Sequence, residues 1–159
     1  MKNTLFLILF ILILILIQLP FLSVVLPLII VPNLIIALSF SFALYEKEEL
    51  AYRAGLIGGV LFDLLTFNIV GETSLIITVC LFLFSLYRRY VSKSLVSGFL
   101  GVLFANSVYL WFAEYGSSLN LRFYLVNGLV VFVLALVFRQ VLNWLTFSFK
   151  SNFYSAKHK

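Results

Sequence analysis

The chain has 159 residues, of which 64% are hydrophobic and only 11% are charged, and its formal net charge is +5. About a quarter of the residues of a soluble domain are charged, so this composition excludes a water-soluble globular protein and is typical of an integral membrane protein. The basic residues flank apolar runs instead of forming a patch, which argues against a nucleic-acid partner and indicates the lipid bilayer. One cysteine, Cys80, and one histidine, His158, can form neither an internal disulfide nor a cysteine-based metal site, and we expect no cofactor.

Two helices are predicted within residues 5–45, which contain no charge. A single helix of that length would be about 60 Å long, twice the thickness of the hydrocarbon core of a bilayer. Pro20, Pro27 and Pro32 would each remove a helical hydrogen bond, so we place the turn between the two helices somewhere from Pro20 to Pro32. The basic start and the apolar run after it resemble a signal peptide. No small-x-small cleavage site follows, so we expect an uncleaved first span.

Four further helices are predicted by apolar runs that polar segments separate. The runs cover about residues 51–70, 73–87, 95–113 and 123–138, and the last reaches residue 144 in a longer alternative. The charged residues 46–49 end the second helix and are most simply a solvated connector. We therefore predict an all-α integral membrane protein. A six-helix transmembrane bundle would occupy residues 1–145, and a short basic cytoplasmic tail would occupy residues 146–159.

The distribution of lysine and arginine predicts how the six spans are oriented. Ten of the eleven fall at the two termini and in alternate connections, whereas the other connections hold only Arg122. Basic residues are enriched on the cytoplasmic side of membrane proteins. We therefore expect both termini in the cytoplasm, and the connections around Gly71 and Gly116 on the outer side.

A carboxylate and a stripe of small residues mark the third predicted helix. Asp63 is the charged residue that lies well inside a predicted span, and Ala51, Gly55 and Gly59 precede it at intervals of four residues. Small residues at this spacing let two helices approach closely, and a carboxylate inside a membrane needs a polar partner. Candidate partners are Asn106, Asn127 and Arg122. Either Asp63 contacts a ligand or partner protein, or it hydrogen-bonds to neighbouring helices and fixes their packing.

A second stripe of small residues marks the fifth predicted helix and leads to Asn106. Its members are Ser94, Ser97, Gly98, Gly101 and Ala105. The pattern indicates close helix packing or the docking of a partner's helix, and Asn127 in the sixth helix admits the same two interpretations. The sequence contains no nucleophile with a base, no phosphate-binding glycine loop and no carboxylate cluster outside residues 46–49. We therefore expect a protein that is not an enzyme.

A distinctive residue pattern runs from the second predicted helix to the end of the third. It consists of Val31-Pro32-Asn33-Leu34, then Arg53-Ala54-Gly55-Leu56-Ile57-Gly58-Gly59-Val60-Leu61-Phe62-Asp63-Leu64-Leu65, and then Gly71. Over these 40 or so residues, the chain resembles the MreD family of bacterial rod-shape-determining membrane proteins. In that family Pro-Asp/Asn-Leu opens the second helix, and a glycine-rich helix ends in Gly-x-x-x-Asp-Leu before a further glycine. Asn33 stands in place of the commoner aspartate, and Asn127 stands where the family often has an asparagine.

The resemblance implies a non-catalytic membrane component of the bacterial elongation (Rod) complex, located in the inner membrane. Such a component binds the single-pass protein MreC and supports cell-shape control and lateral peptidoglycan synthesis. RodA, a class B penicillin-binding protein and MreB would be indirect partners. The residues that we expect at helix-packing or partner interfaces are Pro32, Asn33, Arg53, Gly55, Gly59, Asp63, Gly71, Gly101, Asn106 and Asn127.

One alternative is another small membrane scaffold or a holin-like protein. The other is a substrate-binding S-component of an energy-coupling-factor transporter, a fold to which MreD itself is similar. An S-component should have a polar, aromatic pocket open to the outside and small-residue motifs on its first helix. Residues 5–17 contain no alanine, which favours the MreD interpretation.

Overall fold

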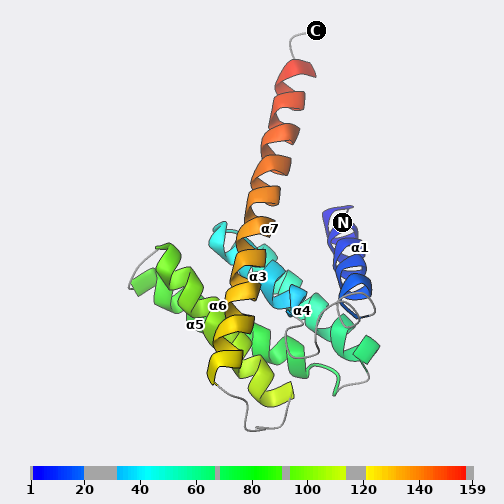
Figure 1. The fold of residues 1–159 in the computed structure, drawn as a ribbon. Coiled ribbons are helices and arrows are strands. Elements are labelled where there is room, and N and C mark those ends of the chain that lie inside the picture. The colour runs from blue at the N-terminus through cyan, green and yellow to red at the C-terminus, as the bar shows by residue number, and fades with distance from the viewer. Residues whose placement is uncertain (1, 20–31, 67–68, 91–93, 114–120, 157–159) are drawn as a thin grey trace.

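The computed structural model describes residues 2–19, 32–66, 69–90, 94–113 and 121–156. These residues form six α-helices and no strand, so the prediction of an all-α protein is confirmed for this part of the chain. The helices are α1 (Lys2–Ile17), α3 (Leu34–Leu44), α4 (Glu48–Thr66), α5 (Glu72–Tyr90), α6 (Leu95–Ala113) and α7 (Leu121–Ala156) (Figure 1). The predicted turn after Pro20 falls on residues 20–31, which lie outside the described residues.

The observed helix bounds differ from the predicted ones mainly in α4 and α7. Helix α4 ends at Thr66, whereas the sequence predicted a helix to residue 70. Helix α7 has 36 residues, so the predicted boundary at residue 145 between bundle and tail falls inside one continuous helix. Helix α6 has the predicted bounds, and α5 runs to Tyr90 through the two arginines that were predicted to follow it.

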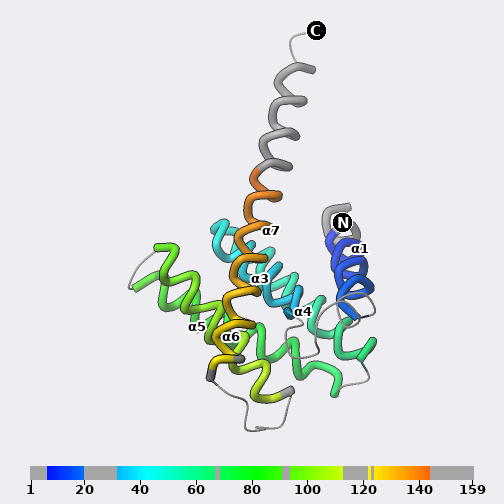
Figure 2. The backbone as a smooth tube through the Cα atoms, in the orientation of Figure 1, coloured from blue at the N-terminus to red at the C-terminus, as the bar shows by residue number. Residues whose placement is uncertain are grey.

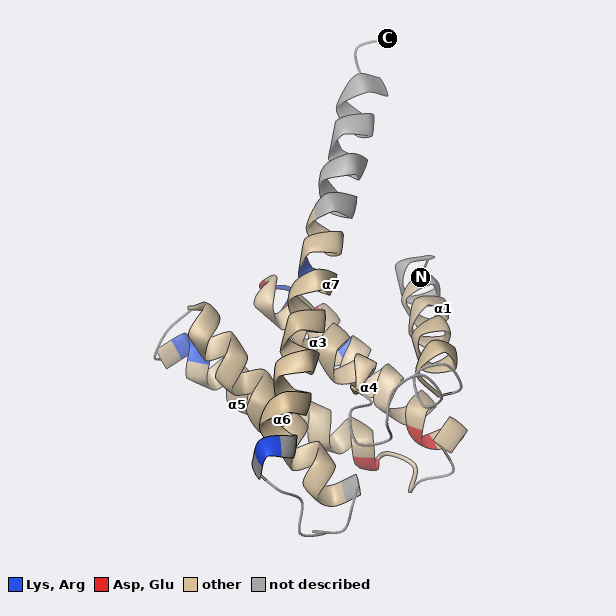
Figure 3. Cartoon of the chain, viewed as in Figure 1, with Lys and Arg blue, Asp and Glu red and all other residues tan. Residues whose placement is uncertain are grey.

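Three stretches are long and apolar enough to cross a membrane, namely Glu72–Tyr90, Leu95–Phe112 and Tyr124–Asn143. Figure 3 shows that long parts of the helices carry no charged residue. Helix α3 has 11 residues and is therefore about 16 Å long, roughly half the thickness of the hydrocarbon core. The length and composition of these helices thus indicate a membrane protein.

Helix α3 lies at the centre of the fold. All of its residues are buried, and it contacts α1, α4, α5, α6 and α7 (Figure 2). A helix that is apolar on every side is stable inside a protein core or in contact with lipid, and here other helices cover it. The largest of its fully buried side chains is Phe40, whose ring lies 5.2 Å from that of Phe84 on α5.

The N-terminus of α3 is satisfied by side chains. Asn33 is the N-cap residue, and its Oδ1 accepts from the backbone N–H of Ile35 at 3.0 Å and of Ile36 at 3.1 Å. The remaining N–H, that of Leu34, donates to Oε1 of Gln18 just beyond α1, at 3.0 Å. Since a buried helix end cannot be hydrated, these bonds allow α3 to begin inside the protein.

The C-terminus of α3 is closed by a Schellman motif. Lys47 N–H donates to the Phe42 carbonyl at 3.0 Å, and Glu46 N–H donates to the Ala43 carbonyl at 3.1 Å. Glu46 occupies the left-handed position of this motif with φ of 60°, where glycine is usual. Arg88 from α5 donates a further hydrogen bond to the Ala43 carbonyl at 2.6 Å. The short helix α3 therefore lies within an apolar bundle, and both of its ends are hydrogen-bonded.

Candidate functional site

The candidate site begins with the small-residue face of α4. Ala51, Gly55, Gly59 and Asp63 are all buried, and α4 packs along α5. A Cβ atom added to Gly59 would lie 2.5 Å from the backbone nitrogen of Ser74 on α5, and one added to Gly55 would lie 2.7 Å from Cγ2 of Ile77. The two helix backbones therefore approach so closely at Gly59 that no side chain fits between them.

Gly58 serves a second face of α4. A Cβ atom added there would lie 2.6 Å from Cγ2 of Ile35 on the central helix and 3.5 Å from Cγ2 of Ile11 on α1. Because Gly58 and Gly59 point to different sides, α4 packs closely on α3 with one face and on α5 with the other.

Asp63 binds the start of α5. Its Oδ2 accepts from the backbone N–H of Gly71 at 2.9 Å and of Thr73 at 3.1 Å. The latter bond is the one that an N-cap side chain normally makes, and here Gly71, which has no side chain, precedes the helix. A carboxylate at a helix N-terminus also interacts favourably with the helix dipole.

The predicted partners of Asp63 are wrong. The hydrogen bonds of this carboxylate go to the α4–α5 connection and not to Asn106, Asn127 or Arg122. The reason is that α4 ends at Thr66, so Asp63 lies in its last turn and within reach of the next helix. This geometry favours the packing interpretation of Asp63 over contact with a ligand.

Gly71 is required by backbone conformation, not by space. Its φ is +98°, a value that side chains other than hydrogen rarely allow, and nothing lies within 4 Å of the position of its missing Cβ. This conformation aims the Gly71 N–H at Asp63. Gly71 and Asp63 thus form one structural unit across the connection.

The entry to α3 lies near this unit. Pro32 and Asn33 are buried, and the side chain of Tyr109 on α6 interacts with that of Asn33 and lies within electrostatic range of Asp63. The structure therefore brings Asn33, Asp63 and Gly71 to the same end of the bundle. Tyr109 was not singled out by the sequence analysis, because an aromatic residue near a helix end is common in membrane proteins.

The two asparagines form a separate pair between α6 and α7. Asn106 Nδ2 donates to Oδ1 of Asn127 at 3.3 Å, and both residues are buried. Nearby on α6, Gly101 faces the Phe84 ring and Gly98 faces Leu44, whereas Ser94 accepts from the Ser97 N–H at 3.2 Å and caps the helix locally. Part of the second stripe is therefore packing and part is capping.

Arg53 stands apart from the other residues of the pattern. It is exposed and pairs with Glu49 one turn earlier on the same helix, at 2.5 Å. An exposed pair of this kind contributes at most about 1 kcal/mol. The predicted role of Arg53 at a helix-packing or partner interface stays a prediction.

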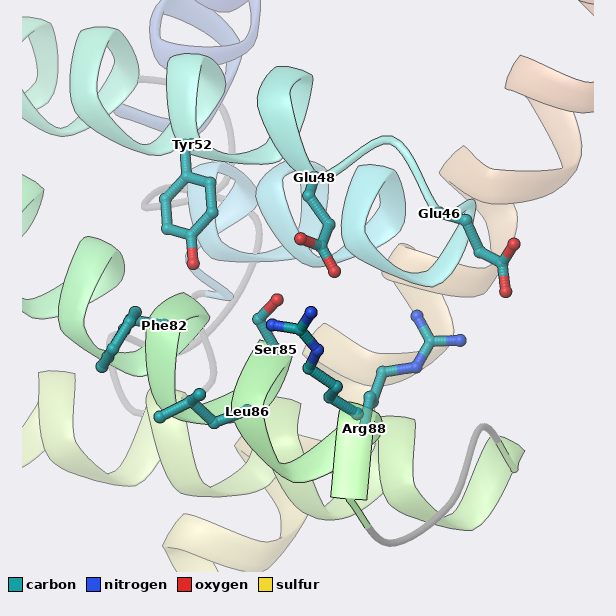
Figure 4. A pocket seen from close by; sticks show the side chains of 8 residues that line it. Glu46, Glu48, Tyr52, Phe82, Ser85, Leu86 and Arg88 are labelled. Carbon is teal, nitrogen blue, oxygen red and sulfur yellow. The ribbon is translucent and has the colours of Figure 1, made fainter.

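A cavity of about 600 Å³ lies at the opposite end of α4 and α5 (Figure 4). Glu46, Glu48 and Tyr52 line one side, and the α5 residues Ser85, Arg88 and Arg89 contribute polar groups to the other. This cavity was not predicted from the sequence, because residues 46–49 were interpreted as a solvated connector. The signal available in the sequence was a pair of oppositely charged segments. Acidic residues lie within residues 46–49, and two arginines follow the fourth predicted helix.

No protein-family model, curated protein or solved structure matches the chain. Within the described ranges, no group of three or more histidine, cysteine or acidic side chains could hold a metal ion.

Proposed function

We propose that the chain is an MreD-type membrane component of the bacterial elongation complex, and that it acts as a non-catalytic scaffold. The observation that carries this proposal is the joint structural role of the residues that resemble the family. Gly59 lets α4 reach α5, and Asp63 binds the N–H of Gly71. Two residues of the family pattern, Asp63 and Gly71, thus bond to each other, so this part of the pattern acts as one structural unit.

The proposed protein has six spans in the bacterial inner membrane, with both termini in the cytoplasm, and an architecture similar to that of an S-component. Its nearest partner would be a single-pass MreC-like protein, with RodA, a class B penicillin-binding protein and MreB further out. The candidate site supports a scaffold, because Oδ1 of Asn33 and Oδ2 of Asp63 are bonded to the N-termini of two helices.

The alternative function is capture of a small substrate as an S-component. That function needs a polar pocket open to the outer side. The 600 Å³ cavity lies at the end with Arg88 and Arg89, which the positive-inside rule assigns to the cytoplasm. The cavity therefore gives this alternative no support.

The orientation is tested with reporter fusions. Because ten of the eleven basic residues fall on one side of a six-span arrangement, we expect a reporter after Lys159 to be active in the cytoplasm. Reporters inserted near Gly71 and Ser117 should be active in the periplasm. A periplasmic C-terminus would exclude the proposed six spans.

The function is tested by depletion in a rod-shaped host. We expect depleted cells to become round and a single-pass MreC-like protein to co-purify with the tagged chain from native membranes. Re-expression of the wild-type chain should restore rod shape and serves as the control. Normal shape together with loss of uptake of a vitamin would contradict the scaffold proposal and favour the S-component.

A further inference from the structure

The cavity between the start of α4 and the end of α5 carries charges of both signs. Glu46 and Glu48 approach from the α3–α4 connection and α4, whereas Arg88 comes from α5 (Figure 4). Arg89, the next residue of α5, also lines the cavity. Arg88 is tied to the C-terminus of α3 through its bond to the Ala43 carbonyl. Arg89 is exposed, and no described residue forms an ion pair with it. The free cation of the cavity is therefore Arg89.

An apolar track leads along α5 into this cavity. Leu75, Val79, Phe82 and Leu86 are all exposed, and they recur at intervals of three or four residues, so they share one face of the helix. Phe82 and Leu86 also line the cavity, and Arg89 continues the same face one turn later. The track thus runs about 20 Å from the other end of the helix to a charged pocket.

We propose that this cavity binds the headgroup of a phospholipid that carries both a phosphate and a primary ammonium group, with an acyl chain along the α5 track. Arg89 binds the phosphate, because a guanidinium group donates two parallel hydrogen bonds to phosphate oxygens. Glu48 accepts from the ammonium group. Basic pockets between membrane helices are a common location for lipid headgroups.

The two glutamates decide which class of headgroup fits. A headgroup with net negative charge would meet the cations of Arg88 and Arg89 but also two carboxylates, whose repulsion costs affinity. A zwitterionic headgroup pairs with both signs of charge.

The proposal is tested by native mass spectrometry of the full-length chain in detergent. The probe is an equimolar mixture of dioleoyl phosphatidylethanolamine and dioleoyl phosphatidylglycerol, which share acyl chains and phosphate and differ in the ammonium group. We expect the wild type to retain phosphatidylethanolamine severalfold more than phosphatidylglycerol. Arg89→Gln should reduce phosphatidylethanolamine retention about tenfold, the effect of losing one charge-assisted interaction.

Two matched controls, Lys47→Gln and Glu49→Gln, separate specific binding from a general charge effect. Lys47→Gln removes an exposed cation at the same end without touching the cavity, so retention should not change. Glu48→Gln should raise the retention of phosphatidylglycerol relative to phosphatidylethanolamine, whereas Glu49→Gln, one residue outside the cavity, should leave the ratio unchanged. The proposal is overturned if the wild type retains both lipids equally or prefers phosphatidylglycerol. It is also overturned if Arg89→Gln and Lys47→Gln have the same effect.

Discussion

Replacement of Gly59 by leucine is expected to abolish the folded protein, and replacement by alanine to weaken it. Even the single methyl group of alanine would lie 2.5 Å from the backbone nitrogen of Ser74, which cannot rotate away as a side chain can. Overpacking of a close interface costs about 1–3 kcal/mol. For a chain of this size, Gly59→Ala should therefore lower the unfolding temperature by about 2–12 °C.

The measurement is thermal unfolding in detergent, monitored by fluorescence-detected size-exclusion chromatography. Gly128→Ala is the matched control, because the nearest atom to its added Cβ is a side-chain atom of Leu103 at 3.3 Å, which can yield slightly. This control should lower the unfolding temperature less than Gly59→Ala. Equal stability of Gly59→Ala and the wild type would contradict the close approach of α4 and α5.

Replacement of Asp63 by leucine is expected to be the most destabilising change of a polar residue. The N–H groups of Gly71 and Thr73 would lose their acceptor, and Thr73 is buried away from water. A hydrogen bond to a charged group contributes about 1.5–3 kcal/mol, so the free energy of unfolding should fall by about 3 kcal/mol or more. Asp63→Asn keeps an acceptor oxygen and should cost about 0.3–1 kcal/mol, the charge–dipole contribution.

The same pair of variants distinguishes packing from partner binding. Both are assayed for unfolding temperature, for retention of the MreC-like protein and for restoration of rod shape. A stable Asp63→Asn protein that complements fully is the expected result, because the carboxylate bonds to backbone of its own chain. If the Asp63→Asn protein is stable but loses the MreC-like partner, the charge of Asp63 instead contributes to the interface with that partner.

The helices were predictable where apolar runs end in charged or glycine-containing segments. Helix α6 begins after Ser94, whose hydroxyl caps it, and α5 lies between Gly71 and the two arginines of its last turn. The end of α4 was less predictable. Leu64 and Leu65 are apolar and continue the helical pattern, yet α4 ends at Thr66. Beyond this end, the N–H of Gly71 donates to Asp63.

The partners of Asp63 could not be predicted from side-chain types. The predicted partners were polar side chains, namely Asn106, Asn127 and Arg122. The actual donors are backbone N–H groups, which every residue except proline carries and which leave no trace in a sequence. The same holds for Arg88, whose acceptor is the carbonyl of Ala43, 45 residues earlier.

The burial of α3 on every side has a consequence for the order of assembly during synthesis. Its cover includes α7, and one bond at its C-terminus comes from Arg88. At about 5–20 residues per second, the ribosome needs roughly 5–20 s after α3 to complete α7. Throughout that interval this apolar helix lacks its final neighbours. The N-terminal helices must therefore wait in a provisional arrangement, and the last helix completes the fold by closing over a segment made long before it.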